Sequence, residues 1–412
     1  MTDPPELQLA RQSVNAALSV ANSSMSLIAR GRKEAASLRH DHAPSKIAAI
    51  RNQAEQGNAD AQYTLAEELS RTTVLEGGKF LPNPSLDEAE AVHWYRLAAE
   101  QGHREAQYEL GSRYAKGEGV PKDETEATCW LSRAADLGHL FAIIEVVDRD
   151  FEGIDAPLDR ESSVRLRLRG ADTALVEPEW DDDARITAIH WGAEIGHVAS
   201  HNFLGDWYRT DHCWPTPRNY GEAAKWYKLA AEQGNASAQF NLGNMYVHGR
   251  GVPQDDKEAL RWYRLAAEQG HASAQSNLGV MYEYGVPQDY KEALRWYRLA
   301  AEQDHASGQN NLGNMYVHGR GVPQDDKEAL RWYRLAAEQG YSIAQVNLGN
   351  MYSNGRGLPQ DYVRAHMWFN LAGSVGDPDG VKNRDTVAAN MTPAQVAEAQ
   401  QLARDWKPTT AK

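Results

Sequence analysis

A tryptophan recurs at nearly constant spacing along most of this 412-residue chain. It always occupies the same place in a phrase of the type EALRWYRLAAEQG, and the eight copies are Trp94, Trp130, Trp191, Trp226, Trp262, Trp296, Trp332 and Trp368. Successive copies are 36, 61, 35, 36, 34, 36 and 36 residues apart, so the period is about 36 with one insertion of 25 residues. Residues 241–270 recur letter for letter at 311–340. A period of this length predicts stacked copies of one supersecondary unit.

Each unit divides into two helices. In the unit that begins near Ala236, small and apolar residues recur at helical spacing and predict a first helix, namely Ala238, Leu242, Met245 and Tyr246. Gly243 lies inside this helix and costs roughly 1 kcal/mol relative to Ala. Because a glycine stands at this position in most copies, we expect the paired helix to approach closely there.

The turn between the two helices is specified by its own residues. Gly249 and Gly251 allow left-handed backbone, Pro253 stops the first helix, and Asp255 with Glu258 predicts a capping box for the second helix. The second helix then has one apolar face, made by Ala259, Trp262, Tyr263, Ala266 and Ala267. One helix pair cannot cover this face, so the copies must stack, and the sequence predicts an all-α solenoid.

These residues resemble a known family, the Sel-1-like repeat, a relative of the tetratricopeptide repeat. Residues 236–270 read almost without change as A-x-A-Q-x-x-L-G-x-x-Y-x-x-G-x-G-V-P-x-D-x-x-E-A-x-x-W-Y-x-x-A-A-E-Q-G, and the resemblance covers roughly residues 50–376. It implies a right-handed α-α superhelix of about eight 36-residue repeats with a helical cap at each end. It also implies a bacterial adaptor or scaffold that acts in signalling, envelope biology or host interaction.

The repeat pattern sets the expected organisation of the chain. We expect an N-terminal helical or partly disordered cap at 1–40, which alternatively serves for self-association or partner binding, and repeats 1–2 with the start of repeat 3 at 41–150. An insertion at 151–180 interrupts repeat 3, and the remaining repeats span 181–376. The cap helix and tail occupy 377–412, where Thr392 and Pro393 predict a helix start. Longer turns are expected between Leu69 and Trp94 and at 209–219, either as contact loops or as tolerated insertions.

Bulk composition narrows the classes of partner. A formal net charge of −14 disfavours general binding to nucleic acid or to anionic membranes. No run of about 18 apolar residues predicts a membrane span, and no signal peptide is recognisable, so we expect a cytoplasmic protein, with secretion by a route without a cleavable signal left open. The two cysteines, Cys129 and Cys213, fit a reducing compartment. We expect a monomer.

The sequence holds little catalytic or metal-binding chemistry. His197, His201, His212 and Cys213 form the one cluster of metal-ligand residue types, but His197 stands at an inter-helix position that is histidine in other copies. We therefore predict no metal and no cofactor. No nucleophile elbow or phosphate loop is found, because the Gly-x-Gly sequence lies between two helices. Some cysteine-rich relatives bind or hydrolyse β-lactams, but they carry a cysteine pair in each repeat. We therefore predict no enzyme activity, with a β-lactam hydrolase as the rival hypothesis and a secreted host-interaction factor as a third.

The candidate binding residues are asparagines that recur on the first helices. They are Asn241, Asn277, Asn311 and Asn347 at one position and Asn244, Asn314 and Asn350 at another. An amide offers both a donor and an acceptor, so a column of amides suits the backbone of an extended peptide. The alternative is that these amides bridge adjacent repeats. We expect a scaffold that holds a partner protein or peptide on the concave face formed by the first helices.

Overall fold

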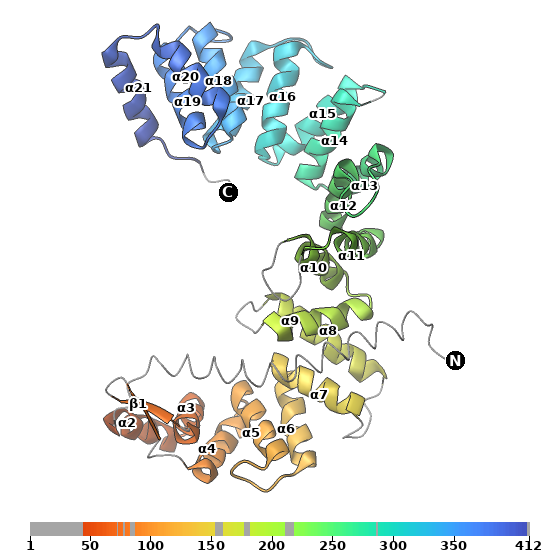
Figure 1. Cartoon of the computed structure of the whole chain (residues 1–412), viewed down its shortest axis with the longest axis vertical. Coiled ribbons are helices and arrows are strands. Elements are labelled where there is room, and N and C mark those ends of the chain that lie inside the picture. The colour runs from red at the N-terminus through yellow and green to blue at the C-terminus, as the bar shows by residue number, and fades with distance from the viewer. Residues whose placement is uncertain are drawn as a thin grey trace. The chain divides into compact units, whose positions relative to one another are not determined.

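A computed structural model of the chain describes residues 44–71, 73–76, 79–82, 87–152, 160–176, 182–210, 218–285 and 287–409. These residues form helices α2 to α21 and one two-stranded sheet (Figure 1). The expected N-terminal cap at 1–40 lies outside the described residues. The chain divides into two compact units, Met1–Ser200 and His201–Lys412, which are treated separately below.

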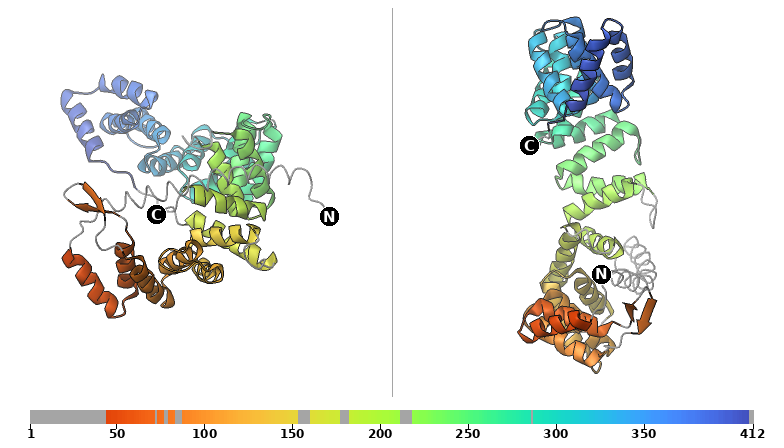
Figure 2. Two further views of the ribbon diagram at one scale, coloured as in Figure 1. Left: turned by 60° about the horizontal axis from the view of Figure 1, so that its bottom comes forward. Right: turned by 90° about the vertical axis from the view of Figure 1, so that its left-hand side faces the viewer.

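Unit 1 contains eight helices within its described residues. Their bounds are α2 (Pro44–Glu55), α3 (Ala59–Ser70), α4 (Glu88–Glu100), α5 (Arg104–Lys116), α6 (Glu124–Asp136), α7 (Leu140–Glu152), α8 (Arg160–Val176) and α9 (Asp182–Glu194). Consecutive helices pack against one another, as Figure 2 shows from two further directions. Its core consists mainly of alanine, leucine, isoleucine and valine together with the repeated tryptophans Trp94, Trp130 and Trp191.

Unit 2 also consists of consecutive helices. Helix α10 (Val198–Arg209) spans the boundary and is followed by α11 (Tyr220–Glu232), α12 (Ala236–His248), α13 (Asp256–Glu268), α14 (Ala272–Tyr284), α15 (Tyr290–Glu302), α16 (Ala306–His318), α17 (Asp326–Glu338), α18 (Ser342–Asn354), α19 (Tyr362–Ser374), α20 (Pro378–Ala388) and α21 (Pro393–Asp405). We call α12, α14, α16 and α18 the first helices of their repeats and α13, α15, α17 and α19 the second helices. Each first helix packs against its own second helix and against the helix before it, which is α11 in the case of α12.

The recurring glycine marks the closest approach within a helix pair, as predicted. A Cβ atom added to Gly243 would lie 2.6 Å from Cδ1 of Tyr263, and one added to Gly313 would lie 2.7 Å from Cδ1 of Tyr333. Tyr263 and Tyr333 are both buried. The tyrosine ring therefore takes the space that a side chain on the first helix would need, which explains a glycine in the middle of a helix.

Aspartate caps each second helix of the repeated type, but the predicted capping box is only half formed. The Asp255 side chain accepts hydrogen bonds from the backbone N–H groups of Lys257 and Glu258 at 2.9 and 3.1 Å. The Glu258 carboxylate instead accepts from Arg261 at 3.2 Å. An arginine one turn further along the helix thus takes the place of the N-cap backbone as donor to this glutamate.

Histidine caps several helices in both units, namely α5, α7, α14 and α16. Nδ1 accepts from the backbone N–H three residues on, at 3.2 to 3.3 Å, in His103, His139, His271 and His305. Asn58 and Asn235 hold the same position and accept through Oδ1 at 2.9 Å. Burial lowers the pKa of the His271 imidazole, and burial together with the neighbouring His271 lowers the pKa of His305. Both caps work only in the neutral form, because a protonated Nδ1 cannot accept.

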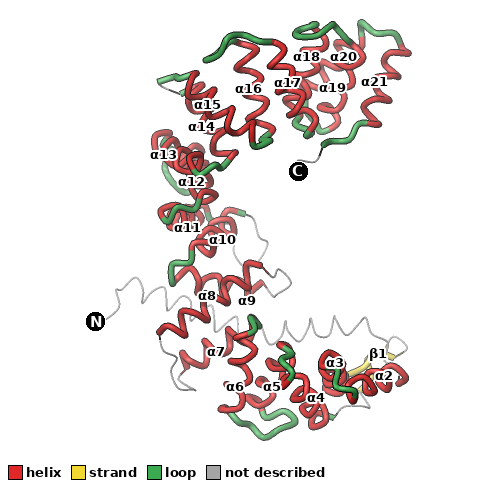
Figure 3. Tube along the Cα trace, turned by 180° about the vertical axis from the view of Figure 1, so that it is seen from behind, coloured by secondary structure: helices red, strands yellow, loops and turns green. Residues whose placement is uncertain are grey.

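Two segments predicted to interrupt the repeat pattern, the long turn after Leu69 and the insertion at 151–180, contain regular structure. Between α3 and α4, β1 (Thr73–Glu76) pairs antiparallel with β2 (Lys79–Pro82), which is the one exception to the all-α prediction among the described residues (Figure 3). The 151–180 insertion contains helix α8, which is packed between α7 and α9: a Cβ on Gly170 would lie 3.1 Å from Ile143 and 3.7 Å from Ala188. The insertion therefore adds a packed helix rather than only a surface loop.

The carboxyl end closes the stack of unit 2. Thr392 and Gln395 form a reciprocal capping box at the start of α21, so the predicted helix start is confirmed. Helix α20 adds a second helix to the predicted cap and packs on α19. The Trp406 ring meets Trp368 edge-on with centroids 6.0 Å apart, and the Thr409 N–H donates to the Glu338 carbonyl at 2.7 Å.

The Gly–Tyr contact predicts the effect of a single methyl group. We expect Gly313→Ala to lower stability, because overpacking costs about 1–3 kcal/mol and outweighs the roughly 1 kcal/mol that Ala gains over Gly in helix propensity. The midpoint of urea unfolding measures this, with the exposed Lys327→Ala as the control that adds Ala to the paired helix. An unchanged or higher midpoint for Gly313→Ala would contradict the close approach.

The histidine caps predict a pH dependence. Because the pKa values of His271 and His305 are lower in the folded state, the unfolded chain binds protons first as the pH falls below about 6.5, and stability decreases through that window. A His271→Asn/His305→Asn variant keeps the cap, as Asn58 and Asn235 do, and should lose less stability on acidification. Thermal unfolding of the wild type and the variant at about pH 7.5 and pH 5 tests this. If the unfolding temperature of both proteins decreases equally on acidification, the histidine caps are not the source of the pH dependence.

Candidate functional site

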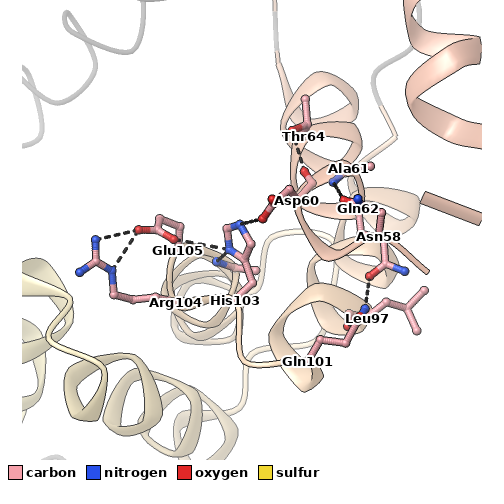
Figure 4. Close-up of polar contacts among 11 residues, drawn as sticks. Asn58, Asp60, Ala61, Gln62, Thr64, Leu97, Gln101, His103, Arg104 and Glu105 are labelled. Carbon is pink, nitrogen blue, oxygen red and sulfur yellow. Dashed lines mark hydrogen bonds and ion pairs between the residues drawn. The ribbon is translucent and has the colours of Figure 1, made fainter. Parts of the chain in front are cut away.

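The repeats are joined by a buried glutamine that links three helices, which the sequence reasoning did not single out. In unit 1, Gln62 Nε2 donates to the Ala54 carbonyl of α2 at 3.1 Å, and Gln62 Oε1 accepts from Gln101 Nε2, at the end of α4, at 2.6 Å. Figure 4 shows Gln62 and Gln101 together with the Asn58 cap and His103, whose Nε2 lies 3.5 Å from Asp60. The sequence does contain a signal for this contact, because a glutamine recurs at one position among the apolar residues of the repeats.

The same contact repeats along the chain. Gln107, Gln239, Gln275, Gln309 and Gln345 each donate to an alanine carbonyl eight residues earlier, at 3.0 to 3.3 Å. In three of these repeats the glutamine also accepts from a second-helix glutamine, at 2.7 to 2.8 Å. These glutamines are buried, so they serve the architecture and are not offered to a ligand.

The seven predicted asparagines all lie on the first helices of unit 2 and are all partly buried. We call them the asparagine face, and its members are Asn241, Asn244, Asn277, Asn311, Asn314, Asn347 and Asn350. Each occupies the sixth or ninth place after the residue that caps its helix. They therefore recur at matching places in successive repeats.

Some of these amides bridge neighbouring groups. Asn244 Oδ1 accepts from the Tyr263 hydroxyl at 2.6 Å, and Asn277 Nδ2 of the next repeat donates to Asn244 Oδ1 at 3.4 Å. The Tyr333 hydroxyl donates to Asn314 Oδ1 at 2.6 Å in the identical copy. Burial raises the pKa of Tyr263 to about 12, so the phenol stays protonated and able to donate. The alternative of inter-repeat bridging thus applies to part of the face.

Other members keep hydrogen-bonding capacity. Asn347 Nδ2 donates to Asn310 Oδ1 at 2.9 Å, and Asn350 Oδ1 accepts from Asn383 at 3.5 Å. Asn311 accepts from Asn310 through Oδ1, which leaves its two Nδ2 hydrogens free within the described part of the chain. Asn241 makes no side-chain hydrogen bond to any described residue.

A surface pocket of about 150 Å³ adjoins this face at the first junction of unit 2. Among the residues that the structure describes, its lining combines two arginines, a histidine and two amides with no acidic side chain, and consists of Arg209, Tyr220, Asn241, Asn244, Met245, His248 and Arg250. We call it the arginine pocket.

Unit 1 differs at the positions that correspond to the asparagine face. Glu109 and Glu145 stand at the sixth place after the helix cap, and Glu67 and Asp148 stand at the ninth. Burial raises the pKa of the Glu145 carboxyl, against the opposing effect of Lys116. The column of amides is therefore a property of unit 2, whereas four of the six matching positions on α3, α5 and α7 are acidic and the other two are Thr64 and Ser112.

The predicted metal-ligand candidates hold other partners where they are described. His197 Nδ1 lies 2.8 Å from Ser200 Oγ, and its Nε2 lies 3.3 Å from Asp172. His201 stands at the place of the bridging glutamine, with Nδ1 3.1 Å from Gln233 Nε2, and stacks on Trp226. His212 and Cys213 lie outside the described residues, and no group of three possible ligands occurs in the part that is described.

No helix among the described residues is long and apolar enough to cross a membrane.

Comparison with known proteins identifies the repeat. The family model described as Sel1 repeat matches residues 59–103, 104–139, 198–235, 236–271, 272–305, 306–341 and 342–377. These are seven copies, against the eight tryptophan-bearing units counted in the sequence. The remaining unit, with Trp191, lies in the unmatched segment 140–197 that contains the insertion and α8. The extra helix interrupts the 36-residue spacing on which the repeat pattern depends.

Solved structures similar to this chain include two bacterial repeat proteins. A Sel1 repeat protein from Oxalobacter formigenes is 30% identical over 85% of this chain and 92% of its own, with a TM-score of 0.49. A protective antigen of uropathogenic Escherichia coli strains with the SLR fold is 28% identical over 87% of this chain and 94% of its own, with a TM-score of 0.30. A comparison with curated proteins gives no match. The repeat matches cover more than half of the sequence, and the chain belongs to the Sel1 repeat family.

Proposed function

We propose that this protein is a scaffold that binds a segment of a partner protein along the asparagine face of unit 2. Solenoids of Sel1 repeats generally serve as protein-interaction scaffolds. The observation that carries the proposal is the recurrence of partly exposed amides at matching places on successive first helices. A regular repeat of identical polar groups suits a regular ligand, and an extended peptide backbone offers alternating donors and acceptors.

The local hydrogen bonds support this assignment. The tyrosine hydroxyls donate to the oxygens of Asn244 and Asn314, which fixes each amide and leaves its nitrogen as a donor for a ligand. Asn311 likewise uses its oxygen for Asn310. A peptide carbonyl lying over these positions would accept from side chains that are already held in place, so little conformational entropy is lost on binding.

The proposal assigns the protein a binding role without a catalytic residue, metal or cofactor. A formal net charge of −14 favours a protein segment over nucleic acid as the ligand. The asparagine face and the exposed polar face of the second helices carry different side chains. Substitutions can therefore test the two faces separately.

The test compares substitutions on the two faces. An Asn277→Ala/Asn311→Ala variant removes two amides from the asparagine face, and Lys291→Ala/Lys327→Ala removes two exposed side chains from the second helices α15 and α17. We expect the asparagine variant to recover about tenfold less partner in quantitative affinity capture from the native cell, as expected for the loss of two hydrogen bonds, and the lysine variant to match the wild type.

Circular dichroism establishes that both variants are folded. Equal partner recovery by the wild type and a folded asparagine variant would contradict the assignment of the face, as would a selective loss in the lysine variant.

A further inference from the structure

Two turns of identical sequence dock in the same way on the repeat before them. Arg250 and Arg320 both lie in the sequence HGRGVP, between glycines with positive φ. A Cβ on the second glycine of each turn would lie 2.0 Å from the Tyr220 carbonyl oxygen or 2.4 Å from that of Tyr290. The two guanidinium groups lie 5.8 and 5.7 Å from the centroids of these tyrosine rings. The two turns thus share their sequence, backbone and aromatic neighbour.

The two turns differ in the charge that the preceding repeat presents. Arg320 donates to Glu283 Oε1 at 2.7 Å, and the Glu283 side chain is only 3% exposed. The position of Glu283, twelve residues after the helix cap, is taken by Arg209 in α10. A guanidinium therefore stands at the first junction where the later junction has a carboxylate.

This exchange leaves Arg250 without an acidic neighbour among the residues that the structure describes. Within the described ranges no carboxylate lies at ion-pair distance from its guanidinium, whereas Arg356 of a third turn of this type pairs with Asp326 at 2.6 Å. Arg209 donates to Asp206 at 3.1 Å and to the Tyr227 hydroxyl at 2.9 Å. The junction therefore carries one guanidinium whose charge the surrounding described residues do not neutralise.

The Arg250 guanidinium, which pairs with no described carboxylate, lines the arginine pocket. Arg209, Arg250 and His248 line it together with Asn241, whose amide makes no side-chain hydrogen bond to a described residue. Guanidinium groups bind carboxylates through paired, charge-assisted hydrogen bonds, and an adjacent amide adds a neutral donor. A volume of about 150 Å³ is sufficient for a carboxylate group.

We propose that the arginine pocket binds the carboxylate of an aspartate or glutamate side chain in the partner segment that lies along the asparagine face. This inference rests on the proposed function and adds a rule of specificity to it: the amides hold the backbone of the segment, and the pocket selects an acidic residue at one end. Asn241 and Asn244 belong to both surfaces, so a single extended segment reaches the face and the pocket. The chain has a formal net charge of −14, so the arginine pocket is a local positive site on a protein that is negative as a whole.

The probe is a fluorescent hexaglutamate peptide, compared with hexaglutamine of the same length, and the readout is fluorescence anisotropy with the full chain. We expect hexaglutamate to bind the wild type more tightly and Arg250→Gln to weaken its binding about tenfold, as expected for the loss of a charge-assisted hydrogen bond. The matched control is Arg356→Gln, which removes an arginine from the same type of turn that is already paired. It should change the affinity for hexaglutamate less than about twofold, because Arg356 does not line the arginine pocket and its guanidinium is already paired with Asp326.

Three results would overturn the proposal: equal binding of hexaglutamate and hexaglutamine, equal weakening by both variants, or stronger competition from a single-stranded oligonucleotide than from unlabelled hexaglutamate. Partner capture separates this failure from that of the scaffold role. If Arg250→Gln recovers the partner as the wild type does while Asn277→Ala/Asn311→Ala does not, the pocket assignment is wrong and the scaffold assignment stands.

Discussion

One buried side chain recurs at the junctions of this protein and links helices that belong to different repeats. In six repeats a glutamine stands four places after the helix cap and donates to a carbonyl of the preceding repeat, and in several of them it also accepts from the second helix of its own repeat. Its amide is removed from water, so it is stable only when the neighbouring repeats sit in the correct register. Gln107 shows the dependence: Leu137 stands where other repeats have the second glutamine, and Gln107 Oε1 has no partner among the described residues.

Much of the architecture can be predicted from the sequence, because the same signals recur in many copies of the repeat. The tryptophan period predicts the helix pairs, the recurring glycine predicts the close approach to Tyr263 and Tyr333, and Thr392 predicts the last helix. Features that occur once were harder to predict. The hairpin has a signal in Gly77-Gly78 between two apolar runs, which we interpreted as a loop, and α8 matches no repeat position.

The candidate site was predictable only in part for a related reason. The asparagines are visible as a column in the sequence, but their division between bridging and free amides depends on which hydroxyl lies opposite. The arginine pocket escapes sequence reasoning, since Arg250 and Arg320 have identical local sequences and differ only through Arg209 and Glu283 of the preceding repeats. In a solenoid, copies with the same sequence acquire different properties from their neighbours.

The central claim is that a partner lies on the first helices of unit 2. It is tested most directly by placing a photoreactive amino acid at position 311, on the asparagine face, or at position 327, on the exposed side of α17, and irradiating living cells. The account predicts one cross-linked partner from position 311 and none from position 327. Cross-linking from position 327 alone, or from neither position, would contradict it.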